Sequence, residues 1–199
     1  VTADGFSAGS GPGGGGNGNS SDGGGGAGHG GDGGDDGHLR GVGGAGYGSL
    51  TYPVEMGSSG GSADGNFGGA GGGRLKVFAT GTAEINGAIL MDGTSGPSPV
   101  QEGGGGGAGG SILIEAETLQ GSGTLSAIGG AGAEGDGAED GGSGAGGRIA
   151  LLYEPSTGAF DFSGSHQEFG AASSTHNQGD GGYGTFYTNA TASDLLCDT

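Results

Sequence analysis

The stretch Gly109-Gly110-Ser111-Ile112-Leu113-Ile114-Glu115 carries the pattern that predicts the fold, a glycine pair followed by a short run of large apolar residues. The pattern recurs at Gly72-Gly73-Arg74-Leu75, at Gly146-Gly147-Arg148-Ile149 and, less strictly, at Tyr183-Gly184-Thr185-Phe186. An interval of 37 positions separates each of the residues that follow the glycines, namely Arg74, Ser111, Arg148 and Thr185. A fixed period of about 20–50 residues indicates stacked copies of one supersecondary unit.

Each unit is predicted to contain two strands separated by a turn. The residues after each glycine pair are rich in β-branched, leucine and aromatic side chains, which favour strands. The expected first strands are residues 74–80, 111–117, 148–154 and 185–189. Turns are expected at Gly81, at Gly121 and Gly123, and at Pro155 and Gly158. The expected second strands are residues 83–91, 123–128, 159–163 and 194–197, and residues 1–4 resemble the end of one more.

Equivalent strands from successive units would align in parallel, about 4.8 Å apart, which predicts an all-β parallel solenoid. Two inward columns of side chains are expected: Leu75, Ile112 and Ile149, and then Val77, Ile114 and Leu151. An antiparallel β-sandwich is the alternative, because the two strands of a unit could pair as a hairpin. Tyr47-Gly48-Ser49-Leu50 is a weaker fifth copy out of phase, which predicts a shortened coil.

Glycine dominates the composition, with 62 of 199 residues, whereas about 7% is ordinary. Collagen is excluded because there is no Gly-X-Y period and only 5 prolines are present. Clustered apolar runs argue against simple disorder. Because the large side chains are few, the core must be thin. Backbone hydrogen bonds, bound ions or neighbouring subunits are therefore expected to supplement it.

The glycine tracts between the strands are expected to form ordered arms. Their unit length stays at 37 residues, which a flexible linker would not require. Strands without side chains can approach closely, so polyglycine-II-like arms could pack as hydrogen-bonded bundles. We expect residues 1–65 to be a glycine-rich irregular region with partly ordered arms, mobile mainly over 5–46. Residues 66–199 are expected to be the repeat domain, within one continuous domain.

The charge balance restricts the possible partners. Four Lys and Arg face 22 Asp and Glu, for a formal net charge of −18. Nucleic acid and anionic membranes are therefore not expected partners, since both require clustered cations. No apolar run approaches the roughly 20 residues of a membrane span. The first residues read as the middle of a chain, and Cys197 is expected to pair outside this segment.

The repeat units resemble the glycine-rich repeats of very large extracellular proteins of plants, protists and bacteria. The resemblance lies in Gly-Gly-Ser-Ile-Leu-Ile, in Leu-Gln-Gly-Ser-Gly-Thr-Leu-Ser-Ala and in Gly-Ala-Gly-Gly-Arg-Ile-Ala-Leu-Leu-Tyr. The closing Gly-Tyr-Gly-Thr-Phe-Tyr is also similar to the end of such blocks. It covers residues 66–199 well and 1–65 loosely. It implies a cell-surface or matrix protein and transfers no catalytic residue.

Two acidic clusters on glycine-rich backbone are candidate calcium sites, because calcium takes six to eight oxygen ligands. The candidate ligands are Asp32, Asp35, Asp36, Glu134, Asp136 and Asp140. A solvated acidic surface is the alternative, since neither an RTX repeat nor an EF-hand loop is matched. His29, His38, His166 and His176 lack the close spacing of metal ligands, so we expect surface histidines.

Catalysis is not expected. Glu115 and Glu117 alternate on one predicted strand and Glu154 would lie near Glu117, a pair that could serve glycoside chemistry. A chain without Trp and with four cations lacks the usual sugar subsites. Asn19 and Asn189 begin glycosylation sequons.

We therefore expect an extracellular or cell-surface structural glycoprotein, the building block of a filament or matrix. Its expected partners are copies of itself or neighbouring domains. The alternative is a calcium-stabilised adhesin that binds glycans or ice.

Overall fold

The computed structural model describes residues 1–7, 9–38, 40–63, 65, 67–97, 102–135, 140–173 and 179–189. These residues form eight strands and no helix. The strands are β1 (Arg74–Glu84), β2 (Ala88–Leu90), β3 (Ser111–Gly121), β4 (Thr124–Ser126), β5 (Arg148–Tyr153), β6 (Phe160–Phe162), β7 (Ser165–Gln167) and β8 (Thr185–Thr188). All pairs of these strands are parallel, so the fold is mainly β and the antiparallel hairpin pairing does not occur among them.

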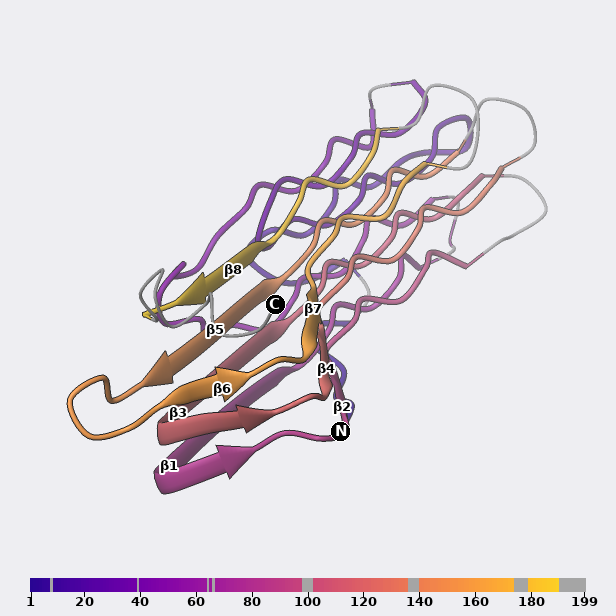
Figure 1. The fold of residues 1–199 in the computed structure, drawn as a ribbon. Helices are drawn as coiled ribbons and strands as arrows, with labels where there is room; N and C mark the ends of the chain where they lie inside the picture. The colour runs from indigo at the N-terminus through magenta and orange to yellow at the C-terminus, as the bar shows by residue number, and fades with distance from the viewer. Residues whose placement is uncertain are drawn as a thin grey trace.

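The larger sheet has the strand order β1-β3-β5-β8, with the short β6 beside the end of β3 (Figure 1). Its register confirms the 37-residue alignment. Arg74 lies opposite Ser111, Ser111 opposite Arg148, and Arg148 opposite Thr185. The first strand of each repeat therefore lies directly beside the equivalent strand of the next.

The smaller sheet consists of β2, β4 and β7. Thr2 forms an isolated parallel bridge with Leu90, so residues 1–4 occupy the position before β2, as the sequence predicted. Ala3 contributes too, because its carbonyl oxygen accepts a hydrogen bond from the Gly73 N–H at 2.7 Å. The N-terminal residues thus cover the outer side of β2.

A strand forms within the predicted range 159–163, as β6, but it is not the second strand of its repeat. Phe160 pairs with Leu119 in the larger sheet, and Ser165–Gln167 takes the place beside β4. The cause is the turn at residues 155–157, where Pro155 has no N–H for the sheet. The turn lengthens this repeat, because Ser165 lies 41 positions after its partner Thr124, compared with the 37-residue interval between the first strands.

The expected turns were only partly right. Gly81 lies inside β1, where the register shifts by one residue relative to β3. Gly121 ends β3 with φ +114°, a value that side chains disfavour, and the chain bends there into the smaller sheet.

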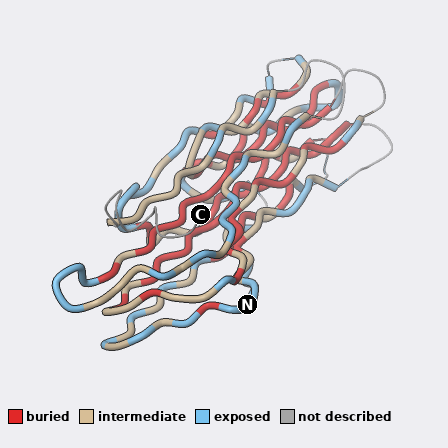
Figure 2. Tube along the Cα trace, viewed as in Figure 1, coloured by how far each residue is buried: buried red, intermediate tan, exposed pale blue. Residues whose placement is uncertain are grey.

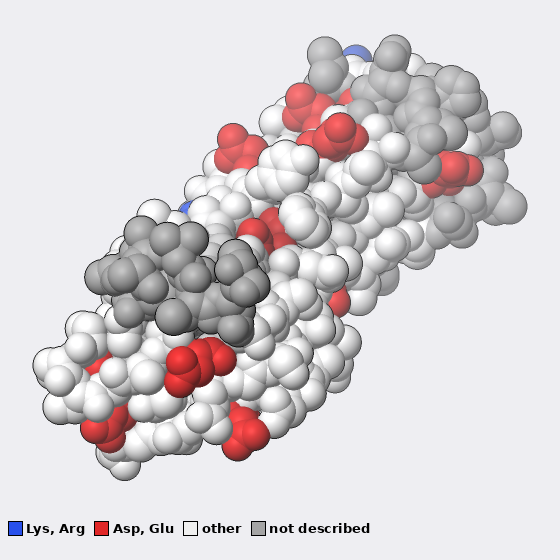
Figure 3. All heavy atoms as spheres, in the orientation of Figure 1, with Lys and Arg blue, Asp and Glu red and all other residues white. Residues whose placement is uncertain are grey.

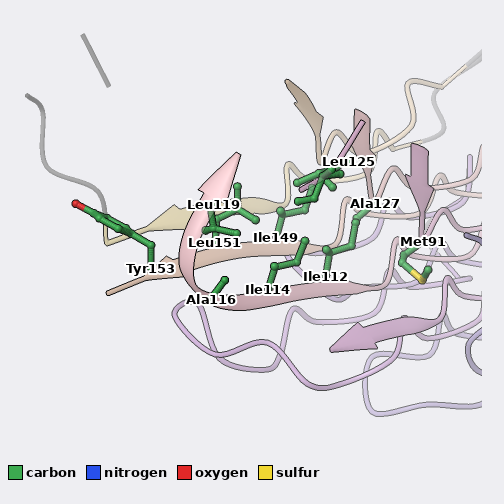
Figure 4. Packing of buried hydrophobic residues seen from close by; sticks show 11 residues of the cluster. Met91, Ile112, Ile114, Ala116, Leu119, Leu125, Ala127, Ile149, Leu151 and Tyr153 are labelled. Atoms are coloured by element: carbon green, nitrogen blue, oxygen red, sulfur yellow. The ribbon is translucent and has the colours of Figure 1, made fainter. Parts of the chain in front are cut away.

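The apolar core lies between the two sheets. Ile112 and Ile149 are opposite each other and fully buried, and Ile114 and Leu151 form the next pair. Figure 4 shows these columns facing Leu125 and Met91. The columns are the predicted ones, and they extend to Leu75 and Val77 at one end. Both β1 residues are only partly buried, because β1 is the last strand on that side.

Glycine-rich arms run away from the strands and back, and Figure 1 shows them extending together to the opposite end of the molecule. They lie outside the strands but hydrogen-bond to each other. The Gly25 N–H donates to the Gly16 carbonyl, the Gly61 N–H to Gly25, and the Gly105 N–H to Gly61, at 2.8, 2.8 and 3.0 Å. Backbone-to-backbone bonds thus connect four arms across the bundle.

Close approach of the arms explains their composition. A Cβ atom built on Gly105 would lie 1.9 Å from the Gly25 carbonyl oxygen, and one on Gly61 would lie 1.9 Å from the Gly16 oxygen. Both distances are far below van der Waals contact. In Figure 2 the buried part of the chain extends from the strands along these arms.

The glycine-rich first third is part of the same bundle. The Ala27 N–H donates to Gly106, and the Ala27 carbonyl accepts from Ala145, at 2.9 and 2.8 Å. Ala27 is fully buried. Residues 47–50 form no strand, so the shortened coil expected there is not found. The chain therefore packs arms from both halves together rather than separating them at residue 65.

Candidate functional site

The unpaired sides of the larger sheet are the most distinctive surface among the described residues. β1 has β3 as its only strand partner there, and β8 has only β5. A strand at the edge of a sheet presents N–H and C=O groups that can pair with another chain. β1 and β8 are the first and last strands of this parallel sheet, so their unpaired edges face in opposite directions along the axis on which the strands stack.

A groove of about 490 Å³ lies along the β1 edge. Its walls come from the inward side of β1 and from the turn into β2, and Ile114 contributes at its base. The apolar side chains that line it include Val1, Leu75, Val77, Ile85 and Ile89. The core is therefore incompletely covered at this end.

The β8 end of the same core is closed differently. Phe186 continues the column of Ile149, and the His166 ring stacks on it with 3.8 Å between centroids and 11° between planes. His166 Nδ1 lies 3.1 Å from a Glu168 carboxylate oxygen. This end thus presents an aromatic pair next to an acidic side chain.

A buried polar cluster joins the arms to the strands. Arg148 begins β5, and its guanidinium donates to the carbonyl oxygens of Tyr47 and His29 and to the Thr185 hydroxyl, at 2.8, 3.3 and 3.1 Å. Burial lowers the pKa of Arg148, and Glu55 opposes this shift. Burial raises the pKa of the Tyr47 hydroxyl. The centroid of the Tyr47 ring lies 4.7 Å from that of the His29 ring.

His29 contradicts the expectation of surface histidines, because it is fully buried. Its Nδ1 lies 2.7 Å from the Gly109 carbonyl, so the proton is on Nδ1. Nε2 has no hydrogen-bond partner among the described residues. Burial lowers the His29 pKa to about 4. No feature of the sequence distinguished this histidine, since its partners come from residues 47, 109 and 148.

The other histidines are placed differently. The side chains of His38 and His166 are 44% and 41% exposed, as expected for surface histidines. His38 lies 3.5 Å from Asp22. His176 lies outside the described residues.

The aspartates of the first predicted calcium cluster each accept a backbone hydrogen bond. Asp32 accepts from Gly46, Asp35 from Gly43 and Asp36 from Arg40, at 2.7, 2.8 and 2.8 Å. These bonds hold one arm to the next. The described residues include no group of three or more His, Cys, Asp or Glu side chains arranged to hold a metal ion.

The second predicted calcium cluster is only partly described. Asp140 is almost fully buried and accepts a hydrogen bond from the Gly135 N–H at 2.8 Å. Glu134 is exposed, and Asp136 lies outside the described residues. Figure 3 shows acidic side chains spread along the visible face rather than gathered at one point. Calcium binding remains a prediction.

The outward face of the larger sheet carries a second groove, of about 440 Å³, lined by Phe78, Glu115, Glu117, Tyr153 and Glu154 among others. The Glu154 N–H points to the Glu117 carbonyl at 3.4 Å, so these two glutamates are neighbours, as predicted. Lys76 forms an ion pair with Glu115 at 3.1 Å. Phe78 projects outward and is 69% exposed.

The two glycosylation sequons have different environments. Asn19 is exposed, and its side-chain oxygen accepts a hydrogen bond from the Ser21 N–H at 2.9 Å. Asn189 follows β8, and its amide binds both the N–H and the carbonyl of Tyr153, at 2.9 and 2.7 Å. Cys197 lies outside the described residues.

Comparison with known proteins gives no relative. The sequence matches no protein-family model, no curated protein and no solved structure. Among the residues described, none belongs to a helix that could cross a membrane.

Proposed function

We propose that this chain is an extracellular structural protein, a building block of a surface filament or matrix. In this proposal the fold is a parallel β-solenoid with polyglycine-II-like arms. The observation that carries it is the pair of unpaired edges, β1 and β8, at the two ends of one in-register parallel stack. Such edges favour addition of further strands.

The packing of the arms supports a mechanical role. Their interior consists of backbone groups bonded to backbone groups, as between Gly61 and Gly25 at 2.8 Å. Arms held in this way form a stiff projection, while the apolar core remains small. A surface assembly needs stiff units that join end to end, and the bonded arms and the two unpaired edges support both requirements.

Sedimentation velocity of the purified chain tests the proposal. We expect the average mass to rise with protein concentration. It should rise further with added salt, because salt screens the repulsion between chains of net charge −18. A single monomeric species at every concentration and salt level would contradict the proposal.

Ligand binding is a second candidate, favoured by the groove beside Phe78. An exposed aromatic ring next to carboxylates suits a neutral glycan, which stacks on the ring and donates hydroxyl hydrogen bonds. A glycan array should then give a signal that Phe78→Ala removes. Phe67→Ala is the control, because Phe67 is 68% exposed and lies outside the groove. An array without signal would count against this candidate.

A further inference from the structure

β1 has no second strand partner among the described residues, whereas Thr2 forms a bridge beside β2, the strand that follows β1 in the chain. Residues 1–3 lie along the outer side of β2, with Leu90 N–H donating to the Val1 carbonyl at 2.8 Å. Toward β1, this segment accepts a hydrogen bond from the Gly73 N–H at the Ala3 carbonyl, just before the strand begins, and Val1 lines the groove beside Leu75 and Val77. An incoming strand would therefore pair with β1 and leave the smaller sheet as it is.

The apolar side chains at the two ends of the stack belong to the same column. Leu75 begins the column that continues through Ile112 and Ile149 to Phe186. Leu75 borders the open groove, and Phe186 packs only partly buried against the core. A second copy placed with its Phe186 beside Leu75 would continue the column and cover the groove.

Two basic side chains lie at the start of β1 and an acidic one at the start of β8, while Lys76 is also ion-paired with Glu115 and Glu84 lies at the far end of β1. Arg74 and Lys76 lie on the exposed side of β1 and are two of the four Lys and Arg residues in the chain. Glu168 lies next to the start of β8, because its carbonyl accepts a hydrogen bond from the Gly184 N–H at 2.6 Å. In a chain of net charge −18, this arrangement favours head-to-tail contact over contact between like ends.

We propose that the β1 edge binds the β8 edge of a second copy of this chain, in parallel and in the register of the internal repeat. Thr185 of one copy then lies opposite Arg74 of the next, Phe186 opposite Leu75, and Tyr187 opposite Lys76. The contact is heterologous, so it leaves an unpaired edge at each end and generates open-ended rows. This inference rests on the proposed assembly function and specifies its interface.

Disulfide cross-linking in a Cys197→Ala background tests the register. Lys76 and Tyr187 both lie on the face of the sheet opposite the core columns. Neighbouring strands are about 4.8 Å apart, within the Cα separation that a disulfide spans. The double variant Lys76→Cys/Tyr187→Cys should form a ladder of covalent multimers on mild oxidation. Each single variant should give no ladder.

The register control is Thr80→Cys/Tyr187→Cys, in which the first thiol lies on the same exposed side of β1, four residues further along. At about 3.3 Å per residue it is too far from Tyr187 to cross-link efficiently. We expect at least a tenfold lower yield. Equal yields from the two double variants would overturn the proposed register.

The proposed interface and the proposed function can fail separately. If the chain sediments as multimers but the Lys76→Cys/Tyr187→Cys variant gives no ladder, the interface is wrong and assembly stands. If the chain is monomeric and no ladder forms, both are wrong. Circular dichroism of each variant must match the parent chain, and Leu75→Lys provides a second, non-covalent test. A charge at this edge position should reduce multimer formation at least tenfold.

Discussion

Single residues in this protein are constrained mainly by backbone contact. In the arms, the atom closest to a Cβ added on a glycine is usually a backbone carbonyl oxygen of another arm. For Gly105 it is the carbonyl oxygen of Gly25. A carbonyl in a hydrogen-bonded arm cannot rotate away as a flexible side chain would. Glycine is therefore required there for space, not only for backbone freedom.

Gly105→Ala should destabilise the protein by about 3 kcal/mol or more, because the new methyl group would overlap the Gly25 carbonyl. Gly87→Ala is the matched control, since a Cβ at that position meets no atom within 4 Å. Its effect should stay within about 0.5 kcal/mol. Urea unfolding followed by circular dichroism measures both. Equal midpoints for the two variants would refute the close packing of the arms.

His29 should make stability depend on pH. Folding lowers its pKa from the ordinary 6.5 to about 4, mainly through burial. The unfolded chain therefore binds a proton between these values and the folded chain does not, so the free energy of unfolding falls as pH decreases from 6.5 to 4. The full loss is about 3 kcal/mol. Of the nearby charged groups, Arg148 disfavours protonation and Glu55 favours it.

The measurement is urea unfolding of the parent chain and of His29→Gln at several pH values. Carboxylates titrate in the same range, so the difference between the two proteins is the relevant quantity. The difference in unfolding free energy between the parent chain and His29→Gln should become smaller as pH falls from 6.5 to 4. A His29→Gln slope identical to the parent's would show that His29 does not titrate as described.

At the scale of elements, the central strands should contribute more than the edge strand. Ile112 is fully buried between Leu75 and Ile149, whereas Leu75 has a strand neighbour on one side only. Ile112→Ala should cost about 2–5 kcal/mol, and Leu75→Ala clearly less at low protein concentration. Thermal unfolding of dilute protein measures this. A larger loss for Leu75→Ala would contradict the order of strands.

The sequence allowed these columns to be predicted because the period is strict where strands carry large side chains. It located the strand at 159–163 but not its partner. The turn after Glu154 shifts the following residues by a few positions, so residues 160–162 pair with the end of β3 and Ser165–Gln167 pairs with β4. The prediction failed at His29 because the burial of that residue depends on contacts with three distant segments. The sequence predicted that the arms pack together, but it did not predict which glycines contact each other.

At the scale of the molecule, the first third and the repeats should unfold together. Ala27 lies between arms from the repeats and bonds to both Gly106 and Ala145. Among the described residues, these bonds join the two parts directly, so we expect neither part to unfold and leave the other intact. Far-ultraviolet circular dichroism and tyrosine fluorescence should report coincident urea transitions. Two separated transitions would show that the halves are independent.

Electron cryomicroscopy of concentrated protein tests the central claim, that the parallel stack continues from one copy into the next. We expect rows in which the strand spacing of about 4.8 Å runs without interruption across each junction, with β8 of one copy beside β1 of the next. Isolated single particles at every concentration would contradict the claim, and so would rows joined through the tips of the glycine arms.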